Sequence, residues 1–211
     1  IQCSWYKVDA SSNQKTATDG CFEKEFYSSD EGLDELCTST NKHLNTSVCS
    51  KLFRGDIAKQ FRFTPVRAYE DDEYIFKTVS AANSIICIDT PLYNYLNRAN
   101  STMTSAFNIN KIALVTIQKN ICELLKVLYP QRFYAMQKAL CSKQFYILNC
   151  LLQSKLIPNA KEEAEKIKNE ILSSYGEYMN NHEMGNNRLM LLVVKYMPKM
   201  IWQLILKVKF Y

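Results

Sequence analysis

Apolar residues recur at two different spacings along this chain, and the spacing changes near residue 108. Before that point, short alternating or β-branched runs are separated by polar segments. This pattern predicts short strands, at residues 1–8, Glu23–Tyr27, Ser84–Asp89 and Leu92–Leu96. The polar segment from Asp9 to Gly20 is expected to be a turn or loop.

Three helices are predicted among these strands. Ser28 and Glu31 stand at capping-box spacing and predict a helix that runs to about Thr38. Ser47–Gln60 has a helical spacing of apolar residues that is broken at Gly55. The third helix is expected to begin near Glu70 and to end near Ala82.

After residue 108 the apolar residues return every three or four positions, which predicts one helix after another. The predicted helices are an apolar stripe from Leu114 to Leu128, a second from Phe133 to Leu151, and the charged run Asn159–Tyr178. We therefore expect an α/β part at residues 1–107 and an all-helical extension at residues 108–211.

The tail, residues 188–211, is apolar with regularly spaced lysines. Lys195, Lys199, Gln203 and Lys207 recur every four residues and form one polar stripe, and Pro198 is expected to kink or restart the helix. Its uncharged stretches are far too short to span a bilayer. Two interpretations stay open, an interfacial helix on an anionic membrane surface or a core helix packed on the preceding bundle.

The acidic stretch Glu70–Glu73 opens the third predicted helix. At 100° per residue, Asp71 and Asp72 fall on the arc that carries the apolar side chains, whereas Glu73 points away and can form an exposed pair with Lys77. Acids are favoured in any first helical turn by the helix dipole. However, an inward carboxylate is costly unless it lines a wet crevice, where it can act as a general base.

Composition and charge exclude some classes of protein. The chain has 211 residues, 47% of them hydrophobic, which indicates a globular protein rather than a disordered one. Its net charge of +5 is mild, and its basic residues are dispersed without interleaved aromatics. This suits a membrane surface or a phosphorylated ligand, and we expect no nucleic-acid partner.

The eight cysteines contain no Cys-x-x-Cys pair and do not cluster in sequence with the two histidines. Several of the cysteines sit within apolar patterns, where a free thiol behaves as a small hydrophobe. We therefore expect a reducing, cytoplasmic location, with no structural zinc. The chain also begins in an apolar segment without a methionine, so we expect a piece of a longer protein.

Five motifs in order resemble the second half of bacterial family 2 glycosyltransferases, over residues 1 to about 125. They are Val48-Cys49-Ser50-Lys51-Leu52-Phe53-Arg54, Phe61-Arg62-Phe63, Tyr69-Glu70-Asp71-Asp72, Ile88-Asp89-Thr90-Pro91-Leu92-Tyr93-Asn94-Tyr95 and Arg98-Ala99-Asn100-Ser101-Thr102-Met103. These enzymes have a Rossmann-like GT-A fold and build surface polysaccharides. The resemblance implies that this chain is the C-terminal part of such a domain, with short strands.

The resemblance also implies roles for particular residues. Its Glu-Asp pair matches Glu70-Asp71, which makes Asp71 the base that deprotonates the acceptor hydroxyl, with Asp72 as a neighbour that can replace or tune it. The resemblance also implies that Glu70 binds substrate. Arg98 and Ser101 are similar to a segment that lies near the sugar-nucleotide diphosphate, and an arginine fork suits phosphate oxygens. Lys51 falls in a motif near the acceptor, although it can equally serve packing.

The implied activity is transfer of a sugar from a nucleotide-sugar donor to a saccharide or lipid-linked acceptor, by a protein peripheral on the inner face of the plasma membrane. The family also implies a divalent metal, Mg²⁺ or Mn²⁺. Its Asp-x-Asp ligand motif and its nucleotide-binding units are absent from this sequence, so no metal ligand can be assigned and this isolated part is expected to be inactive. The alternative is a non-catalytic remnant or a helical membrane-surface module.

Overall fold

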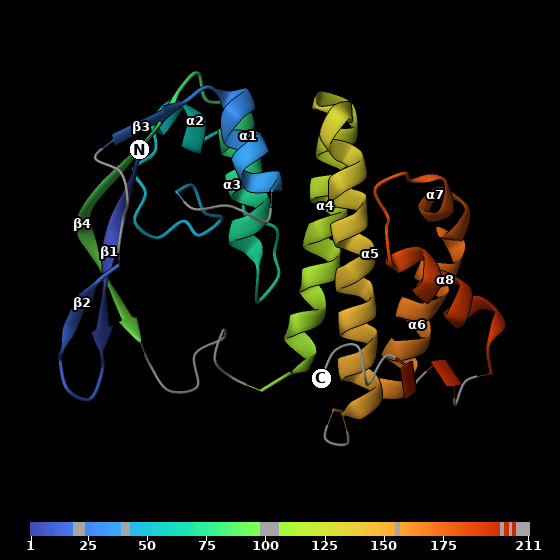
Figure 1. Cartoon of the computed structure of the whole chain (residues 1–211). Coiled ribbons are helices and arrows are strands. Elements are labelled where there is room, and N and C mark those ends of the chain that lie inside the picture. Colours follow the sequence, from blue (N-terminus) through green and yellow to red (C-terminus); the bar gives the residue numbers. More distant parts are fainter. Residues whose placement is uncertain are drawn as a thin grey trace. The chain divides into compact units, whose positions relative to one another are not determined.

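The computed structural model describes residues 1–18, 24–38, 43–97, 106–154, 157–198, 201–202 and 204–205. The chain forms two compact units, Ile1–Ala106 and Phe107–Tyr211. In the described residues the first unit mixes strands with helices, whereas the second consists of helices (Figure 1). The mixed α/β character expected from the sequence is therefore confirmed.

The first unit is built on a four-stranded sheet with the order β2-β1-β4-β3. β1 (Gln2–Asp9) and β4 (Ile85–Asn97) run parallel at its centre, and β2 (Lys15–Ala17) and β3 (Lys24–Tyr27) lie antiparallel at its edges. The strands expected at residues 1–8 and Glu23–Tyr27 are thus confirmed.

Two expectations about the sheet were wrong. β2 lies within the segment expected to be a loop, and β4 is one strand where the sequence predicted two. Proline normally interrupts a ladder because it has no amide hydrogen to donate. Here Pro91 faces Ser4 where the β1–β4 register shifts on both sides of Ser4, so the irregularity accommodates Pro91 and the strand continues.

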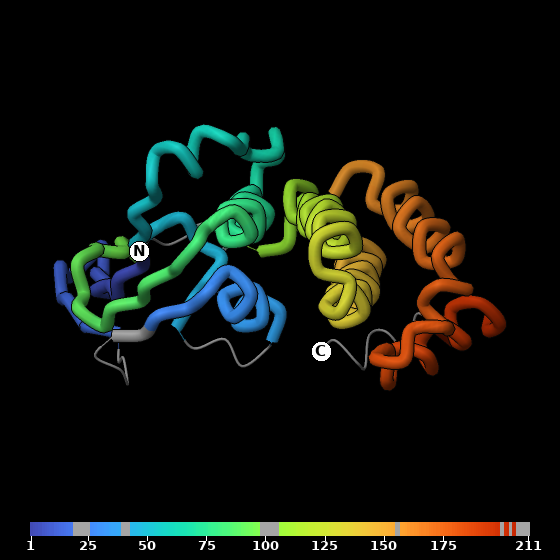
Figure 2. The backbone as a smooth tube through the Cα atoms, turned by 90° about the horizontal axis from the view of Figure 1, so that it is seen from above, coloured from blue at the N-terminus to red at the C-terminus, as the bar shows by residue number. Residues whose placement is uncertain are grey.

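α1 (Ser29–Cys37) begins at the predicted capping box. The Glu31 amide donates to Ser28 Oγ over 3.2 Å, and the Ser28 amide donates to Glu31 Oε2 over 2.7 Å. Figure 2 shows α1 and α3 side by side next to the sheet. At Gly32 the packing is close, because a Cβ there would lie 2.9 Å from Ile85 Cδ1 in β4.

α3 (Glu70–Ser80) confirms the third predicted helix, and it buries Ile75, Phe76 and Val79 as expected. The predicted pair of Glu73 with Lys77 is confirmed, but the predicted exposure of Glu73 was wrong. Its side chain is buried rather than exposed, accepts a 2.6 Å hydrogen bond from Thr64 Oγ1 and pairs with the Lys77 ammonium. The chain before the helix folds over this side of α3.

Phe63, which belongs to the segment before α3, packs on the same helix: its ring stacks on Tyr74 at a centroid distance of 4.3 Å. A residue that helical phase alone places toward solvent is therefore enclosed by a neighbouring segment. Asp71 and Asp72, which phase placed toward the core, are only half-buried.

The helix predicted at Ser47–Gln60 was also wrong over most of its length, since only α2 (Gly55–Ala58) is helical. The preceding residues pair with the start of β1 instead: the Cys3 amide donates to the Ser50 carbonyl over 2.9 Å, and the Leu52 amide donates to the Ile1 carbonyl over 2.8 Å. Tertiary pairing has overridden a weak local preference for helix.

The second unit confirms the three predicted helices, with the third divided at Ser174. After a 3-10 turn, η1 (Ile109–Ile112), its helices are α4 (Ala113–Leu128), α5 (Pro130–Gln153), α6 (Ala160–Ser173), α7 (Tyr175–Asn180) and α8 (Asn187–Tyr196). Among the residues that the structure describes, none of the helices combines the length and apolarity that crossing a membrane requires.

Polar side chains fix α7 and the turn after it against α5. The buried Tyr178 hydroxyl donates to Gln144 Oε1 over 2.7 Å, and Asn181 Nδ2 donates to Gln137 Oε1 over 2.9 Å. Buried polar groups need partners, so these bonds favour one register of the two segments. α8 packs against α5, α6 and α7.

Candidate functional site

The acidic first turn of α3 contacts the loop before α2, which spans residues 43–54. Asp71, the second residue of α3, accepts a hydrogen bond through Oδ2 from the backbone amide of Val48 over 3.1 Å. Tyr69, which caps the helix, has a left-handed backbone with φ of 65°. This conformation turns the chain sharply just before the acids, and so directs Asp71 toward the loop.

Lys51 lies in the same loop and is tied to it from within. Its ammonium donates to Asn45 Oδ1 over 2.8 Å and to the Ser47 carbonyl. Burial lowers the pKa of Lys51 to about 8, and the neighbouring Cys87 and Asp71 only partly oppose this effect. A lysine with such a pKa can exchange a proton near neutral pH, beside a carboxylate.

The loop carrying these contacts is also held by β1. The buried side chain of Gln2 donates to the His43 carbonyl and accepts from the Asn45 amide over 3.1 Å. Ser50, like Tyr69, has a left-handed backbone, with φ of 59°. That conformation costs a non-glycine residue about 1–2 kcal/mol. Strained residues of this kind cluster at functional sites, and Ser50 and Tyr69 each stand two residues from a partner of the Asp71–Val48 contact, which we take as the candidate site.

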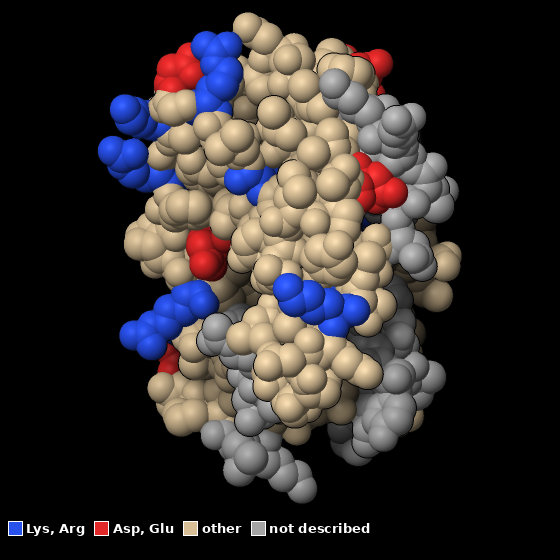
Figure 3. All heavy atoms as spheres, turned by 90° about the vertical axis from the view of Figure 1, so that its left-hand side faces the viewer, with Lys and Arg blue, Asp and Glu red and all other residues tan. Residues whose placement is uncertain are grey.

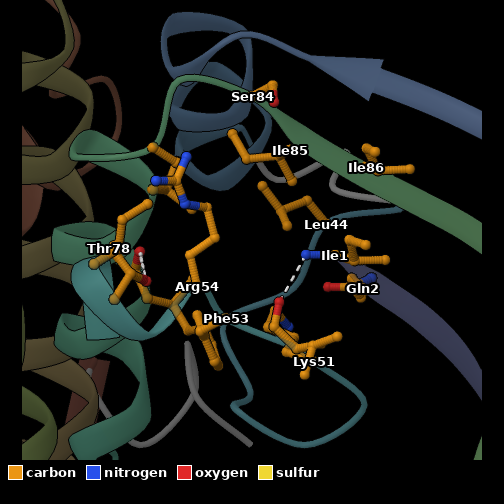
Figure 4. Close-up of a pocket in the computed structure, with 15 residues that line it drawn as sticks. Ile1, Gln2, Leu44, Lys51, Phe53, Arg54, Thr78, Ser84, Ile85 and Ile86 are labelled. Carbon is orange, nitrogen blue, oxygen red and sulfur yellow. Dashed lines mark hydrogen bonds between the residues drawn. The ribbon is translucent and has the colours of Figure 1, made fainter. Parts of the chain in front are cut away.

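A pocket of about 290 Å³ adjoins the loop (Figure 4). Its walls are mainly apolar, with Val79 from α3 and Ile85 from β4 among them. Figure 4 places Gln2 and Lys51 at one end and Thr78 and Arg54 at the other. Lys51 therefore belongs both to the loop that meets Asp71 and to the pocket wall, which puts an ionisable group next to a space of ligand size.

Two further pairs of side chains lie on the strand side of the loop, and neither pair was predicted to have a role. Ser4 Oγ donates to Asp89 Oδ1 over 2.8 Å, and the Tyr93 hydroxyl donates to Cys49 Sγ over 3.5 Å. Asp89 and Tyr93 fall in one of the motifs quoted above, which was the available signal. Figure 3 shows that uncharged side chains cover most of the described surface on this side of the molecule.

The predicted site residues meet different outcomes. Asp71 and Lys51 interact electrostatically, and Glu70 and Asp72 are half-buried in the same first turn of α3. Arg98 and Ser101 lie outside the described residues, so their expected place near a diphosphate stays a prediction.

The divalent metal implied by the resemblance does not fit this site. Within the described ranges, no three histidine, cysteine, aspartate or glutamate side chains lie close enough together to hold a metal ion. Hard divalent cations need several oxygen ligands. The Asp71 carboxylate instead accepts a hydrogen bond from the Val48 amide.

Comparison with known proteins gives no assignment. No protein-family model matches the chain, and no curated protein matches its sequence. The case for any function therefore rests on the residues and their geometry.

Proposed function

We propose that this chain is the acceptor-side part of a nucleotide-sugar-dependent glycosyltransferase of the GT-A type, and that Asp71 is its general base. The observation that carries the proposal is the Asp71 carboxylate, which accepts a hydrogen bond from the Val48 amide over 3.1 Å and interacts electrostatically with Lys51, a residue of the pocket wall. The order of motifs in the sequence supports the same assignment.

The local architecture is consistent with the roles carried over from the family. The Glu-Asp motif opens α3, and the motif around Asp89 lies in β4, the strand that follows. The half-buried Asp71 keeps access to solvent and to a ligand, whereas a fully enclosed acid would not. The proposed cytoplasmic, membrane-peripheral location follows from the same resemblance.

The proposed chemistry is a single displacement at the anomeric carbon of the donor sugar. The acceptor hydroxyl gives its proton to a carboxylate oxygen of Asp71 while its own oxygen forms the new bond to the sugar. The bond from the sugar to the diphosphate breaks, and the nucleoside diphosphate leaves with the bonding electrons. Asp71 needs no change of conformation for this role, because the Val48 amide already fixes its side chain.

Replacing Asp71 by asparagine tests the proposal. Asp71→Asn keeps an oxygen that can accept from Val48 but removes the base, so transfer should fall by about 100-fold or more. The assay is release of nucleoside diphosphate from a panel of UDP- and GDP-hexoses, with the protein expressed from its complete reading frame. An unchanged melting temperature checks that the fold is intact.

Asp30→Asn is the matched control. Asp30 is also the second residue of its helix, is exposed, and loses the same interaction with a helix dipole. It should leave transfer unchanged. If Asp71→Asn retains the activity of the Asp30→Asn control, Asp71 is not the base.

The second candidate is a non-catalytic module that acts at a membrane surface. The observation in its favour is the outward apolar face of α8, described below. It predicts that neither aspartate variant changes the function of the protein, whereas changes on α8 abolish it.

A further inference from the structure

α8 is apolar on two sides. One side packs on the helical unit and buries Met190, Leu191, Val193 and Val194. The other carries Leu189, Leu192 and Tyr196, whose exposed fractions are 65%, 39% and 65%. A surface helix of a globular protein normally turns polar residues outward, so the outer side of α8 is unusual. The core-helix interpretation of the tail is therefore correct for one face only.

Further exposed apolar side chains follow α8 in the chain. Met197, Ile201 and Leu204 are 48%, 45% and 64% exposed, whereas Trp202 is buried. The Lys168 ammonium lies 5.9 Å from the centre of the Trp202 ring, so this turn stays attached to α6. We call Leu189, Leu192, Tyr196, Met197, Ile201 and Leu204 the outer face. Exposed apolar side chains concentrated in one segment are typical of an interaction site.

Tyrosine and lysine border the outer face. The Lys195 ammonium lies 3.6 Å from the centre of the Tyr175 ring and 5.2 Å from that of Tyr196. The two tyrosine rings meet edge to face at 6.5 Å. Amphipathic aromatic rings and long cationic side chains are the residues enriched where a protein surface meets lipid headgroups.

The charge of the chain is concentrated in the same segment. Residues 188–211 contain five basic residues and no acidic one, and the whole chain contains 26 basic and 21 acidic residues. The remaining 187 residues therefore carry 21 of each and are neutral, so the net charge of +5 resides in this tail. The tail is complementary to an anionic surface, whereas the rest of the protein is not.

We infer that the outer face docks on an anionic phospholipid bilayer, with α8 lying in the headgroup region. An apolar helix face with cationic and aromatic borders is the pattern of an interfacial helix. The inference stands independently of the transferase activity proposed above. The predicted polar stripe also includes Lys199, Gln203 and Lys207, which lie outside the described residues.

Flotation of the full chain with phosphatidylcholine vesicles, with and without phosphatidylglycerol, tests the inference. The wild-type protein should float with the anionic vesicles, less so at high salt, and weakly with phosphatidylcholine alone. Leu189→Ser combined with Leu192→Ser should weaken binding by about 100-fold, from about tenfold for each leucine.

The matched control is Val127→Ser combined with Leu128→Ser. These residues of α4 are 77% and 51% exposed, so the change removes as much exposed apolar surface elsewhere. Binding should be unchanged. Absence of flotation with anionic vesicles, or equal effects of the two double variants, would overturn the inference. So would a dimer in size-exclusion chromatography that only the α8 variant dissociates, because the outer face would then bind a second copy.

A substitution that adds a reporter guards against loss of folding. In a protein whose Trp5 and Trp202 are replaced by phenylalanine, Tyr196→Trp places a single indole on the outer face, and its emission should shift to the blue with anionic vesicles and be quenched by brominated acyl chains. Val127→Trp should show neither effect. The inference fails if the Tyr196→Trp protein floats but its emission stays unshifted and unquenched.

Discussion

Lys51 gives the folded protein a dependence on pH that its replacement should abolish. Burial lowers the pKa of this lysine from 10.5 to about 8. The unfolded chain therefore binds more protons than the folded chain between these two values, and the free energy of unfolding rises with pH across that window. Lys51→Met removes the titrating group while keeping a long apolar side chain against the pocket.

The size of the effect follows from the two pKa values. The difference of about 2.5 pH units is worth about 3.4 kcal/mol, at about 1.4 kcal/mol per unit. Because the unfolded pKa lies near the upper end of the accessible range, about 2.5 kcal/mol of this accrues between pH 7 and pH 10. The stabilisation is present above the unfolded pKa and is lost as the pH falls through 8.

The two tryptophans allow the first unit to be followed alone. Trp5 lies in β1 and Trp202 in the helical unit, and the sequence contains no other tryptophan. With Trp202 replaced by phenylalanine, the fluorescence of Trp5 reports urea unfolding of the first unit. The difference in unfolding free energy between Lys51 and Lys51→Met proteins is then measured from pH 7 to pH 10.

The comparison cancels the other groups that titrate in this range, since tyrosines and cysteines are the same in both proteins. We expect the Lys51 protein to gain about 2.5 kcal/mol relative to Lys51→Met as the pH rises from 7 to 10. Parallel curves for the two proteins would show that Lys51 titrates alike in the folded and unfolded chains. A gain in the opposite direction would mean that ion pairing outweighs burial at this lysine.

The remaining predictions use the same Trp5 signal. Glu73→Gln should destabilise the first unit by about 2 kcal/mol, because the Lys77 ammonium loses its counter-charge. Glu70→Gln, the control, should cost less than about 1 kcal/mol. Equal costs for the two variants would argue against a buried Glu73. Gly32→Val should cost about 2 kcal/mol through overpacking against β4, whereas Gly55→Ala, whose added Cβ meets nothing within 4 Å, should be neutral or stabilising by up to about 1 kcal/mol. A neutral Gly32→Val would contradict the close packing of α1.

Features encoded by local spacing were predictable from the sequence. The capping box of α1 needs only Ser28 and Glu31, and the long helices of the second unit need only a stripe of apolar residues. Neither depends on a partner far away in the chain. The same holds for β1, whose residues suit a strand wherever it pairs.

Features decided by distant partners were not predictable. The loop before α2 looked helical by spacing, but its amides and carbonyls are satisfied by β1, by Gln2 and by Asp71. Backbone polar groups that are paired elsewhere leave no advantage for a helix. The sequence predicted two strands separated at Pro91, where the structure has the single strand β4. The register shift that accommodates the proline is a property of the β1–β4 pair and cannot be read from β4 alone.

The error at Glu73 strengthens the choice of base within the acidic turn. Both oxygens of Glu73 are committed, Oε1 to the Lys77 ammonium and Oε2 to the Thr64 hydroxyl, so this acid is structural. Asp71 instead accepts the Val48 amide through Oδ2, and a carboxylate that accepts one such bond keeps lone pairs for another donor. Helical phase placed both Asp71 and Asp72 inward, and the order of motifs then selected Asp71. In the structure its half-buried position and oriented carboxylate are compatible with the proposed role as a base. Of Glu73 and Asp71, only Asp71 combines an oriented carboxylate with access to solvent.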